Sequence, residues 1–263
     1  MDKDSLDFEY LRNEELAEVF YKRAVGILPE MESSKAAANL LSGYVMDGDR
    51  ILDIGCGSGH YLRSLKNTIT KNFDYVGIDN YQIFLNKAKQ AWEDHNDASF
   101  IKGSAYQIPA KDREFDVVLC SNLLLHLPSI IKPIEELTRV SSRLILIRTM
   151  IGERSFRIQE VYNKNWWPLS GIEPKDEFKD DGEPEEFAHR NIYSREYFSS
   201  VIRRFSPRAK IKYIEDDMYS GEGIEESAKT EGLVNATKML AGKQVSGYII
   251  VPWTYVVVEI AQD

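Results

Sequence analysis

Three glycines separated by single residues follow an aspartate in the run Asp53-x-Gly55-x-Gly57-x-Gly59. A short apolar strand is predicted before the glycines, and apolar residues repeat at helical spacing after them. Glycine suits a turn between strand and helix because its backbone can take positive φ, and because a ligand can approach the main chain without meeting a Cβ. The open amides at the start of the helix add hydrogen-bond donors. The pattern therefore predicts a turn that binds a polar ligand.

The spacing of the glycines narrows the kind of ligand. The dinucleotide fingerprint G-x-G-x-x-G would need its third glycine at position 60, where this chain has His60. The Gly-Lys-Ser/Thr of a nucleoside triphosphate loop is also missing. Asp79 ends the next predicted strand, where an acid can accept the hydroxyls of a ribose. Alternatively, Asp53 and Asp79 only form turns at strand ends; their joint spacing favours a ligand that carries a nucleoside.

Strands and helices are predicted to alternate around this turn. Strands are expected at 50–54, 73–78, 99–102, 115–120, 144–149, 209–214 and 253–260, and helices at 13–27, 33–41, 81–92, 132–140, 194–204 and 225–240. Such alternation implies right-handed crossovers. We therefore expect an α/β fold with a doubly wound, mostly parallel seven-stranded sheet and helices on both faces.

The same pattern divides the chain into four parts. Residues 1–44 are expected to form an N-terminal helical cap, and residues 45–150 the ligand-binding core. Residues 151–193 are too long for a plain connection and are predicted to form a lid over the site. Residues 194–263 complete the core and carry a helical insert at about 217–247. The N-terminal helices and the two inserts together would form a cap.

Composition limits the class of protein. The 263 residues are 43% hydrophobic, typical of a globular chain, and the formal net charge of −9 argues against binding along a nucleic-acid backbone. The only two cysteines, Cys56 and Cys120, lie in apolar context and are expected to be small buried residues in a reducing compartment. No apolar run approaches the roughly 18 residues of a membrane span. The sequence therefore predicts a cytoplasmic protein without a membrane segment.

Five motifs follow one another along residues 51–128. They are ILDIGCGSGH at 51–60, VGID at 76–79, GSA at 103–105 and FDVVLCSN at 115–122, followed by LLLHLP at 123–128. This ordered set resembles the class I S-adenosylmethionine-dependent methyltransferases. The resemblance implies that S-adenosyl-L-methionine is the cofactor and S-adenosyl-L-homocysteine the product. It assigns cofactor contacts to Asp53, Gly55, Gly57, Gly59, Asp79, Asn80, Ser104 and Ala105. Asn122 is a further candidate because it lies at the tip of the fourth predicted strand, where cofactor and substrate would both be close. Many relatives have an aspartate where Ser104 stands, so the contact with the adenine amino group is in question.

Two histidines are candidate general bases. His126 follows the fourth predicted strand on the ligand edge of the sheet, and His189 precedes the late helix. Each has an alternative reading as a packing residue. His60 and His95 are predicted to be surface residues of helices.

The acceptor side is expected to include the first insert. Tyr162, Trp166 and Trp167 could form a flat apolar wall or could simply anchor the insert, and Arg190 and Tyr193 are further candidate substrate contacts. The span 190–212 holds seven basic residues and one acid, which suggests either a site for a phosphate or carboxylate or a solvated face. No metal-ligand pattern is recognised.

Three functions are compatible with these observations. The leading hypothesis is methyl transfer to oxygen or nitrogen of a small-molecule acceptor, with nucleic acid disfavoured by the charge. The first alternative keeps the methyltransferase but takes RNA or protein as acceptor. The second is a non-catalytic regulator that binds S-adenosylmethionine.

Overall fold

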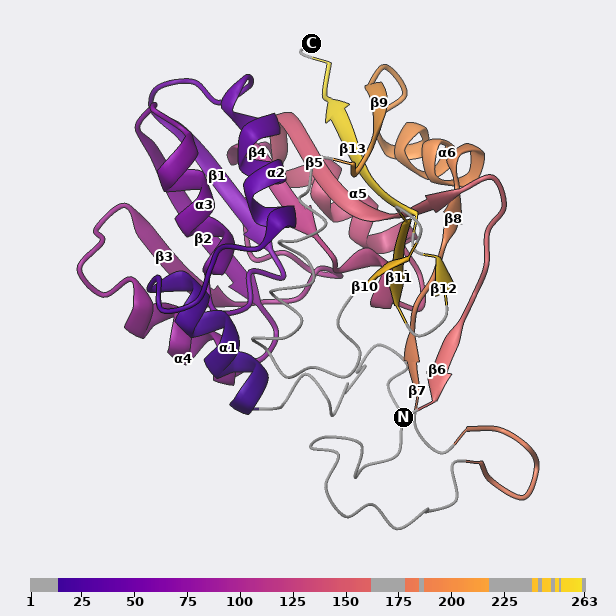
Figure 1. Ribbon diagram of the computed structural model, residues 1–263. Helices are drawn as coiled ribbons and strands as arrows, with labels where there is room; N and C mark the ends of the chain where they lie inside the picture. The colour runs from indigo at the N-terminus through magenta and orange to yellow at the C-terminus, as the bar shows by residue number, and fades with distance from the viewer. Residues whose placement is uncertain are drawn as a thin grey trace.

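The computed structural model describes residues 14–161, 178–184, 187–217, 238–240, 243–246, 249–250 and 252–261. Its central sheet has the order β3-β2-β1-β4-β5-β13-β9 (Figure 1). The strands are β1 (Asp49–Ile54), β2 (Phe73–Asp79), β3 (Ala98–Lys102), β4 (Phe115–Ser121), β5 (Ser141–Gly152), β9 (Lys210–Glu215) and β13 (Trp253–Glu259). The first five are parallel, whereas β13 runs antiparallel to both β5 and β9. The prediction of a mostly parallel, seven-stranded sheet is confirmed, with the short β8 (Tyr193–Ser194) pairing with β5 in addition.

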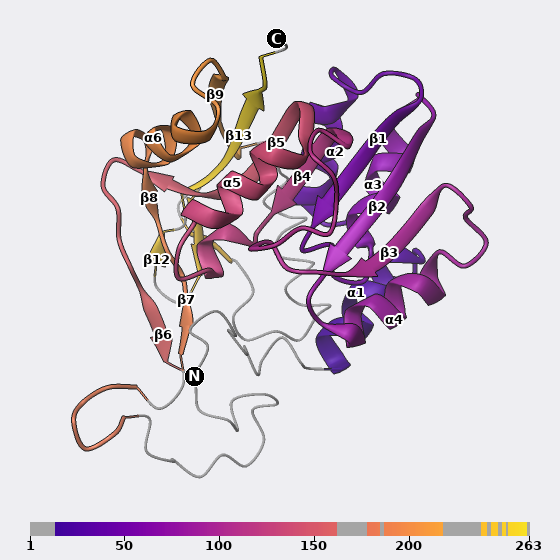
Figure 2. The same cartoon turned by 180° about the vertical axis from the view of Figure 1, so that it is seen from behind.

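Helices cover both faces of the sheet, as expected. One face carries α2 (Glu32–Ser42), α3 (His60–Thr68) and α4 (Gln82–Ala91), and the other carries α5 (Ile131–Val140) and α6 (Arg195–Phe205). Figure 2 shows α5 in front of the strands and α3 behind them. Neighbouring strand residues point to opposite faces, so Ile51 packs in the first layer and Leu52 in the second.

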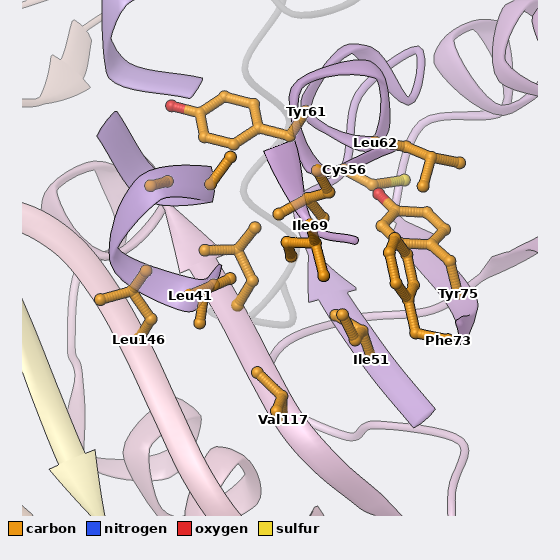
Figure 3. Close-up of a cluster of buried hydrophobic side chains, with 14 of the residues drawn as sticks. Leu41, Ile51, Cys56, Tyr61, Leu62, Ile69, Phe73, Tyr75, Val117 and Leu146 are labelled. Carbon is orange, nitrogen blue, oxygen red and sulfur yellow. The ribbon is translucent and has the colours of Figure 1, made fainter. Parts of the chain in front are cut away.

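The first layer combines aliphatic and aromatic side chains. Leu41 of α2 and Leu62 of α3 lie over Ile51, Val117 and Leu146 of three neighbouring strands (Figure 3). All five are at most 1% exposed. The contact fixes both helices on the sheet, and α3 starts directly after the glycine turn. This packing therefore holds the turn at the carboxyl end of β1.

Helix α1 (Glu14–Ala24) crosses the carboxyl-terminal edge of the sheet beside α4 (Figure 1). It ends at Ala24, three residues earlier than predicted, and Gly26 follows with a φ of +86°. Three bonds fasten it: the Ser58 hydroxyl donates to the Ala17 carbonyl at 2.9 Å, Arg63 of α3 donates to the Arg23 carbonyl at 2.9 Å, and Lys87 of α4 pairs with Glu18 at 2.5 Å. The helix is thereby placed against the glycine turn.

Short strands occupy the described parts of the two inserts. β6 (Gln159–Val161) pairs with β7 (Phe187–His189), and β10 (Lys238–Leu240), β11 (Lys243–Ser246) and β12 (Ile249–Ile250) form a separate antiparallel sheet. The predicted helix at 225–240 is wrong at its end, because Lys238–Leu240 pairs in strand register with β11; residues 225–237 lie outside the described ones. None of the described helices is long and apolar enough to cross a membrane.

Candidate functional site

A cavity of about 290 Å³ opens at the carboxyl ends of β1, β2 and β4. Such a position, outside the strand ends of a doubly wound sheet, is where these folds bind ligands. Its walls come from the glycine turn, the ends of three strands, the loop after β3, the turn η2 (Leu124–His126) and the N-terminal helices. The lining includes the following predicted cofactor residues: Asp53, Gly55, Gly57, Asp79, Asn80, Ser104, Ala105 and Asn122.

The glycine turn presents bare backbone to the cavity. Gly55 and Gly57 have φ values of +79° and +54°, in the left-handed region that glycine adopts without strain. A Cβ on Gly57 would stand 3.2 Å from the Phe20 ring, and one on Gly55 would stand 3.3 Å from Leu123. Gly59 does not line the cavity; its carbonyl accepts a bond from the Trp92 indole at 3.1 Å. The first two glycines are therefore the ones that leave room for a ligand.

Asp79 faces the cavity from the end of β2. One carboxylate oxygen accepts the Gly57 N–H and the other accepts the Tyr81 N–H, each at 3.0 Å. Burial raises the pKa of this carboxyl, while the backbone donors oppose the rise. Each oxygen keeps a second lone pair for a ligand hydroxyl. The geometry therefore suits a pair of neighbouring hydroxyls, such as those of a ribose.

Asp53 lies deeper, at the end of β1, and is 2% exposed. The Tyr75 hydroxyl donates to it at 2.7 Å. Burial raises its pKa to about 7, against the opposing effect of the Tyr75 bond and with a further rise caused by the charge of Asp79. A carboxyl in this state can gain or lose its proton near neutral pH, and it becomes a partner for a cationic ligand group when ionised.

Ser104 and Ala105 lie on the loop after β3, which α5 holds in place. The Glu136 carboxylate accepts the Ile108 N–H at 2.8 Å, and Arg139 donates to the Ile108 carbonyl at 3.0 Å. Within the loop, the Ser104 hydroxyl accepts the Tyr106 N–H at 3.2 Å, and this bond stabilises the turn of the loop itself. The loop therefore presents a fixed edge to the cavity.

His60 is not a surface residue, contrary to the sequence prediction. It is 8% exposed, and its ring stacks on Phe20 with the ring centres 4.3 Å apart. Burial, helped by the charge of Arg23, lowers its pKa to about 3. The prediction failed because α1 closes over the start of α3, a contact between distant segments. His95 is exposed as expected, just past the end of α4.

The two candidate bases occupy different positions. His126 lines the cavity, and its Nδ1–H donates to the backbone carbonyl of His189 at 2.9 Å. That bond leaves Nε2 as the unprotonated nitrogen of the neutral ring. Burial lowers the pKa of His126 to about 4. The ring of His189 is not part of the cavity wall; it lies 3.4 Å from the Arg157 guanidinium.

Asn122 has a φ of +57°, rare for a residue with a side chain. Its side-chain oxygen accepts a bond from Arg148, and its amide nitrogen donates to the Tyr61 hydroxyl at 3.4 Å. Arg148 in turn pairs with Asp216. Sequence reasoning missed this pair because the two residues are 68 positions apart and Arg148 sits in an apolar strand. An arginine within a buried strand is the signal that could have revealed it.

The two predicted substrate residues that the structure describes, Arg190 and Tyr193, do not line the cavity. Arg190 pairs with Glu160 at 2.7 Å, and the Tyr193 hydroxyl donates to the Leu124 carbonyl at 3.1 Å. Tyr162, Trp166 and Trp167 lie outside the described residues. Among the residues that the structure does describe, no group of three His, Cys, Asp or Glu side chains could hold a metal ion. Cys56 and Cys120 are free and buried, as predicted.

Residues 51–143 match a sequence family described as "Methyltransferase domain". Over 106 residues the chain is 34% identical to an uncharacterized methyltransferase of Schizosaccharomyces pombe, covering 37% of this chain and 38% of that protein. Over 96 residues it is 28% identical to the demethylmenaquinone methyltransferase of Staphylococcus saprophyticus, covering 36% and 41%. The chain thus matches less than half the length of these two relatives.

The fold is similar to that of solved structures. One is a SAM-dependent methyltransferase from Methanosarcina mazei, which superposes with a TM-score of 0.54 at 15% sequence identity. That similarity covers 85% of this chain and 98% of the other. At this level of identity the likeness concerns the fold, and the chemistry has to be argued from the cavity.

Proposed function

We propose that this chain transfers a methyl group from S-adenosylmethionine to nitrogen or oxygen of an uncharged small molecule. The chain belongs to the class I S-adenosylmethionine-dependent methyltransferases. The observation that carries the proposal is the cavity itself. Bare glycine backbone, a carboxylate with spare lone pairs and a histidine meet there at the ends of parallel strands. When bound, the cofactor would supply an electrophilic methyl group on a positively charged sulfur.

The residues of the cavity fit this cofactor. Gly55 and Gly57 leave space that a Cβ would fill, beside Asp53, whose carboxylate suits a cationic group. Asp79 would accept the two ribose hydroxyls, and the loop with Ser104 would face the base. These roles follow the ones expected from the motifs, except for Gly59, whose carbonyl accepts a bond from Trp92.

The charges of the wall favour an uncharged acceptor. Among the described lining residues there is no lysine or arginine, and the charged groups are the two carboxyls already assigned to the cofactor. Both lining histidines are neutral at pH 7, because burial holds their pKa values at about 3 and about 4. A phosphate on the acceptor would therefore meet no complementary charge there. Most of the remaining wall is apolar or aromatic, including Leu16, Phe20, Met31, Tyr61, Phe84 and Leu123.

His126 restricts the acceptor further. A base whose conjugate acid has a pKa of about 4 removes a proton from an alcohol poorly. A neutral amine attacks without prior loss of a proton, so it fits the uncharged acceptor that the wall favours. The His126 ring, held by the His189 carbonyl, lines the cavity and would help to position such an acceptor. Alignment of this kind can contribute roughly 7–11 kcal/mol to lowering a barrier.

The segments that flank the cavity support a capping role. Helix α1 and Met31 at the start of α2 form part of its wall. The strand pair β6–β7 ends at His189, beside His126. We propose that the insert at 151–193, of which residues 162–177 and 185–186 lie outside the described ones, covers the acceptor from this side.

RNA as acceptor is the rival function with an observation in its favour, the basic span at 190–212. In the structure, however, Arg190 is paired with Glu160, whereas Arg203, Arg204 and Lys210 are exposed on α6 and the edge strand β9. None of these four lines the cavity. A solvated face therefore accounts for them better.

The proposal is tested by incubating the protein with methyl-tritiated S-adenosylmethionine and three acceptor pools. The pools are apolar arylamines and phenols with a short-tailed demethylmenaquinone, total RNA, and a protein extract. Label in the small-molecule pool is the expected result. Label only in RNA or protein would replace this acceptor class, and binding of the cofactor with no label in any pool would favour a regulator. The variant Asp79→Asn serves as the control for specific transfer.

A further inference from the structure

Arg148 and Asp216 form a buried pair just behind the cavity wall. The Asp216 carboxylate accepts from Arg148 Nε at 2.8 Å and from Nη2 of the same side chain. The two residues are 5% and 7% exposed. Neither lines the cavity. A buried arginine–carboxylate pair is costly to desolvate and adds little net stability compared with apolar residues, so its presence here calls for another explanation.

The third contact of Arg148 leads to the cavity. Its Nη1 donates to the side-chain oxygen of Asn122, and its backbone carbonyl accepts the Asn122 N–H at 2.9 Å. An arginine can only donate, so it fixes which end of the Asn122 amide is the oxygen. The amide nitrogen must then point the other way, toward the Tyr61 hydroxyl. Asn122 and Tyr61 both line the cavity.

The pair is held from behind as well. The Arg148 guanidinium lies 4.0 Å from the centre of the Trp253 ring. The Asp216 N–H donates to the Trp253 carbonyl at 3.0 Å, and the Asp216 carbonyl accepts from the Gln244 side chain at 3.2 Å. Three segments distant in sequence therefore set the position of one guanidinium.

We infer that Arg148 and Asp216 are positioning residues that hold the Asn122 amide with its N–H donors toward the ligand in the cavity. The strained backbone of Asn122 supports this inference, because residues in the left-handed region persist where the surroundings fix them, often at ligand sites. The inference rests on the proposed function for the identity of the ligand, but the orientation of the amide can be tested without any ligand.

The first test follows the side-chain amide signals of Asn122 in a nitrogen–proton NMR spectrum of the ligand-free protein, assigned by their loss in Asn122→Gly. We expect Asp216→Asn to shift these signals and to leave those of the exposed Asn39 in place. The matched control is Asp49→Asn, which breaks the Arg143–Asp49 pair at the opposite end of β1; Asp49, like Asp216, is 7% exposed. Unshifted Asn122 signals in Asp216→Asn would overturn the inference whatever the protein binds.

The second test is a mutant cycle measured by the binding of S-adenosylhomocysteine. Glycine at 122 accepts the positive φ and removes only the amide. We expect Asp216→Asn to weaken binding by about three- to tenfold in the wild-type background, the range for one hydrogen bond. It should change binding by less than about twofold in Asn122→Gly, because coupling is lost with the partner. An equal loss in both backgrounds would mean a merely structural pair and would overturn the inference.

Arg148→Lys provides the answer if Asp216→Asn does not fold. Lysine keeps the charge opposite Asp216 but lacks the planar fork that reaches Asp216 and Asn122 together. It is expected to reproduce the shifted signals and the background-dependent loss, and wild-type behaviour in both tests would contradict the inference. If the wild-type protein does not bind S-adenosylhomocysteine at all, the proposed function fails, and the NMR test alone decides the role of the pair.

Discussion

Replacement of Asp79 by asparagine removes an acceptor that the cavity cannot replace. In the structure the two carboxylate oxygens accept the Gly57 and Tyr81 N–H groups, one each, and each would also accept one ribose hydroxyl. Asparagine has one oxygen and one NH2 group, so one backbone donor and one hydroxyl lose their acceptor. A hydrogen bond to a charged group contributes about 1.5–3 kcal/mol. The dissociation constant of S-adenosylhomocysteine should therefore rise by about 10- to 150-fold.

Isothermal titration at pH 7.5 measures this change. The matched control is Asp74→Asn, because Asp74 is an exposed residue of the same strand and does not line the cavity. The control should bind like the wild type, and both variants should keep the circular dichroism spectrum of the parent. If folded Asp79→Asn binds within about twofold of the wild type, Asp79 does not hold the ligand and the reasoning about the strand end is refuted.

Three other predictions concern the same region. Gly77→Ala should lower the free energy of unfolding in urea by about 1–3 kcal/mol, because a Cβ there would stand 2.7 Å from Phe100. The control Gly43→Ala should keep the wild-type free energy of unfolding, because its Cβ would meet nothing closer than 3.8 Å. Equal losses in the two variants would contradict the clash at Gly77. Burial raises the pKa of Asp53 from about 4 in the unfolded chain to about 7 in the folded protein. Between these pH values the folded protein keeps a proton that the unfolded chain has released, so the free energy of unfolding falls as the pH rises from about 4 to about 7. If the ionised carboxylate receives a cationic group of S-adenosylmethionine, affinity should fall by up to about tenfold per pH unit below pH 7; a flat profile would exclude that role. Phe20→Ala should expose His60 and raise its pKa from about 3 toward the usual value near 6.5, as followed by NMR titration; an unmoved pKa would mean that Phe20 does not shield the ring.

The alternation of strands and helices could be predicted because each element buries a face that its own residues reveal. Ile51 and Leu52 alternate between two layers, and both are apolar, as expected for a strand covered on both sides. The glycine turn and Asp79 were predictable for a similar reason, since the strand end fixes where they lie. In the structure Gly55, Gly57 and Asp79 line one cavity, whereas the Gly59 carbonyl bonds to Trp92.

Contacts between distant segments were beyond such reasoning. His60 looked exposed because only the docking of α1 brings Phe20 onto its ring. The Arg148–Asp216 pair depends on the register of β5, β13 and β9, which places Asp216 just beyond the end of β9. The predicted helix at 225–240 failed at Lys238–Leu240, where pairing with β11 overrides local propensity. In each case the structure depends on a contacting segment elsewhere in the chain, which the neighbouring residues in the sequence do not reveal.

A crystal structure of the protein with S-adenosylhomocysteine tests the central claim most directly. We expect the adenosyl group to lie against Gly55 and Gly57, with both ribose hydroxyls within hydrogen-bond distance of the Asp79 carboxylate. Density for the compound elsewhere on the protein, or a cavity that stays empty at saturating concentration, would contradict the account.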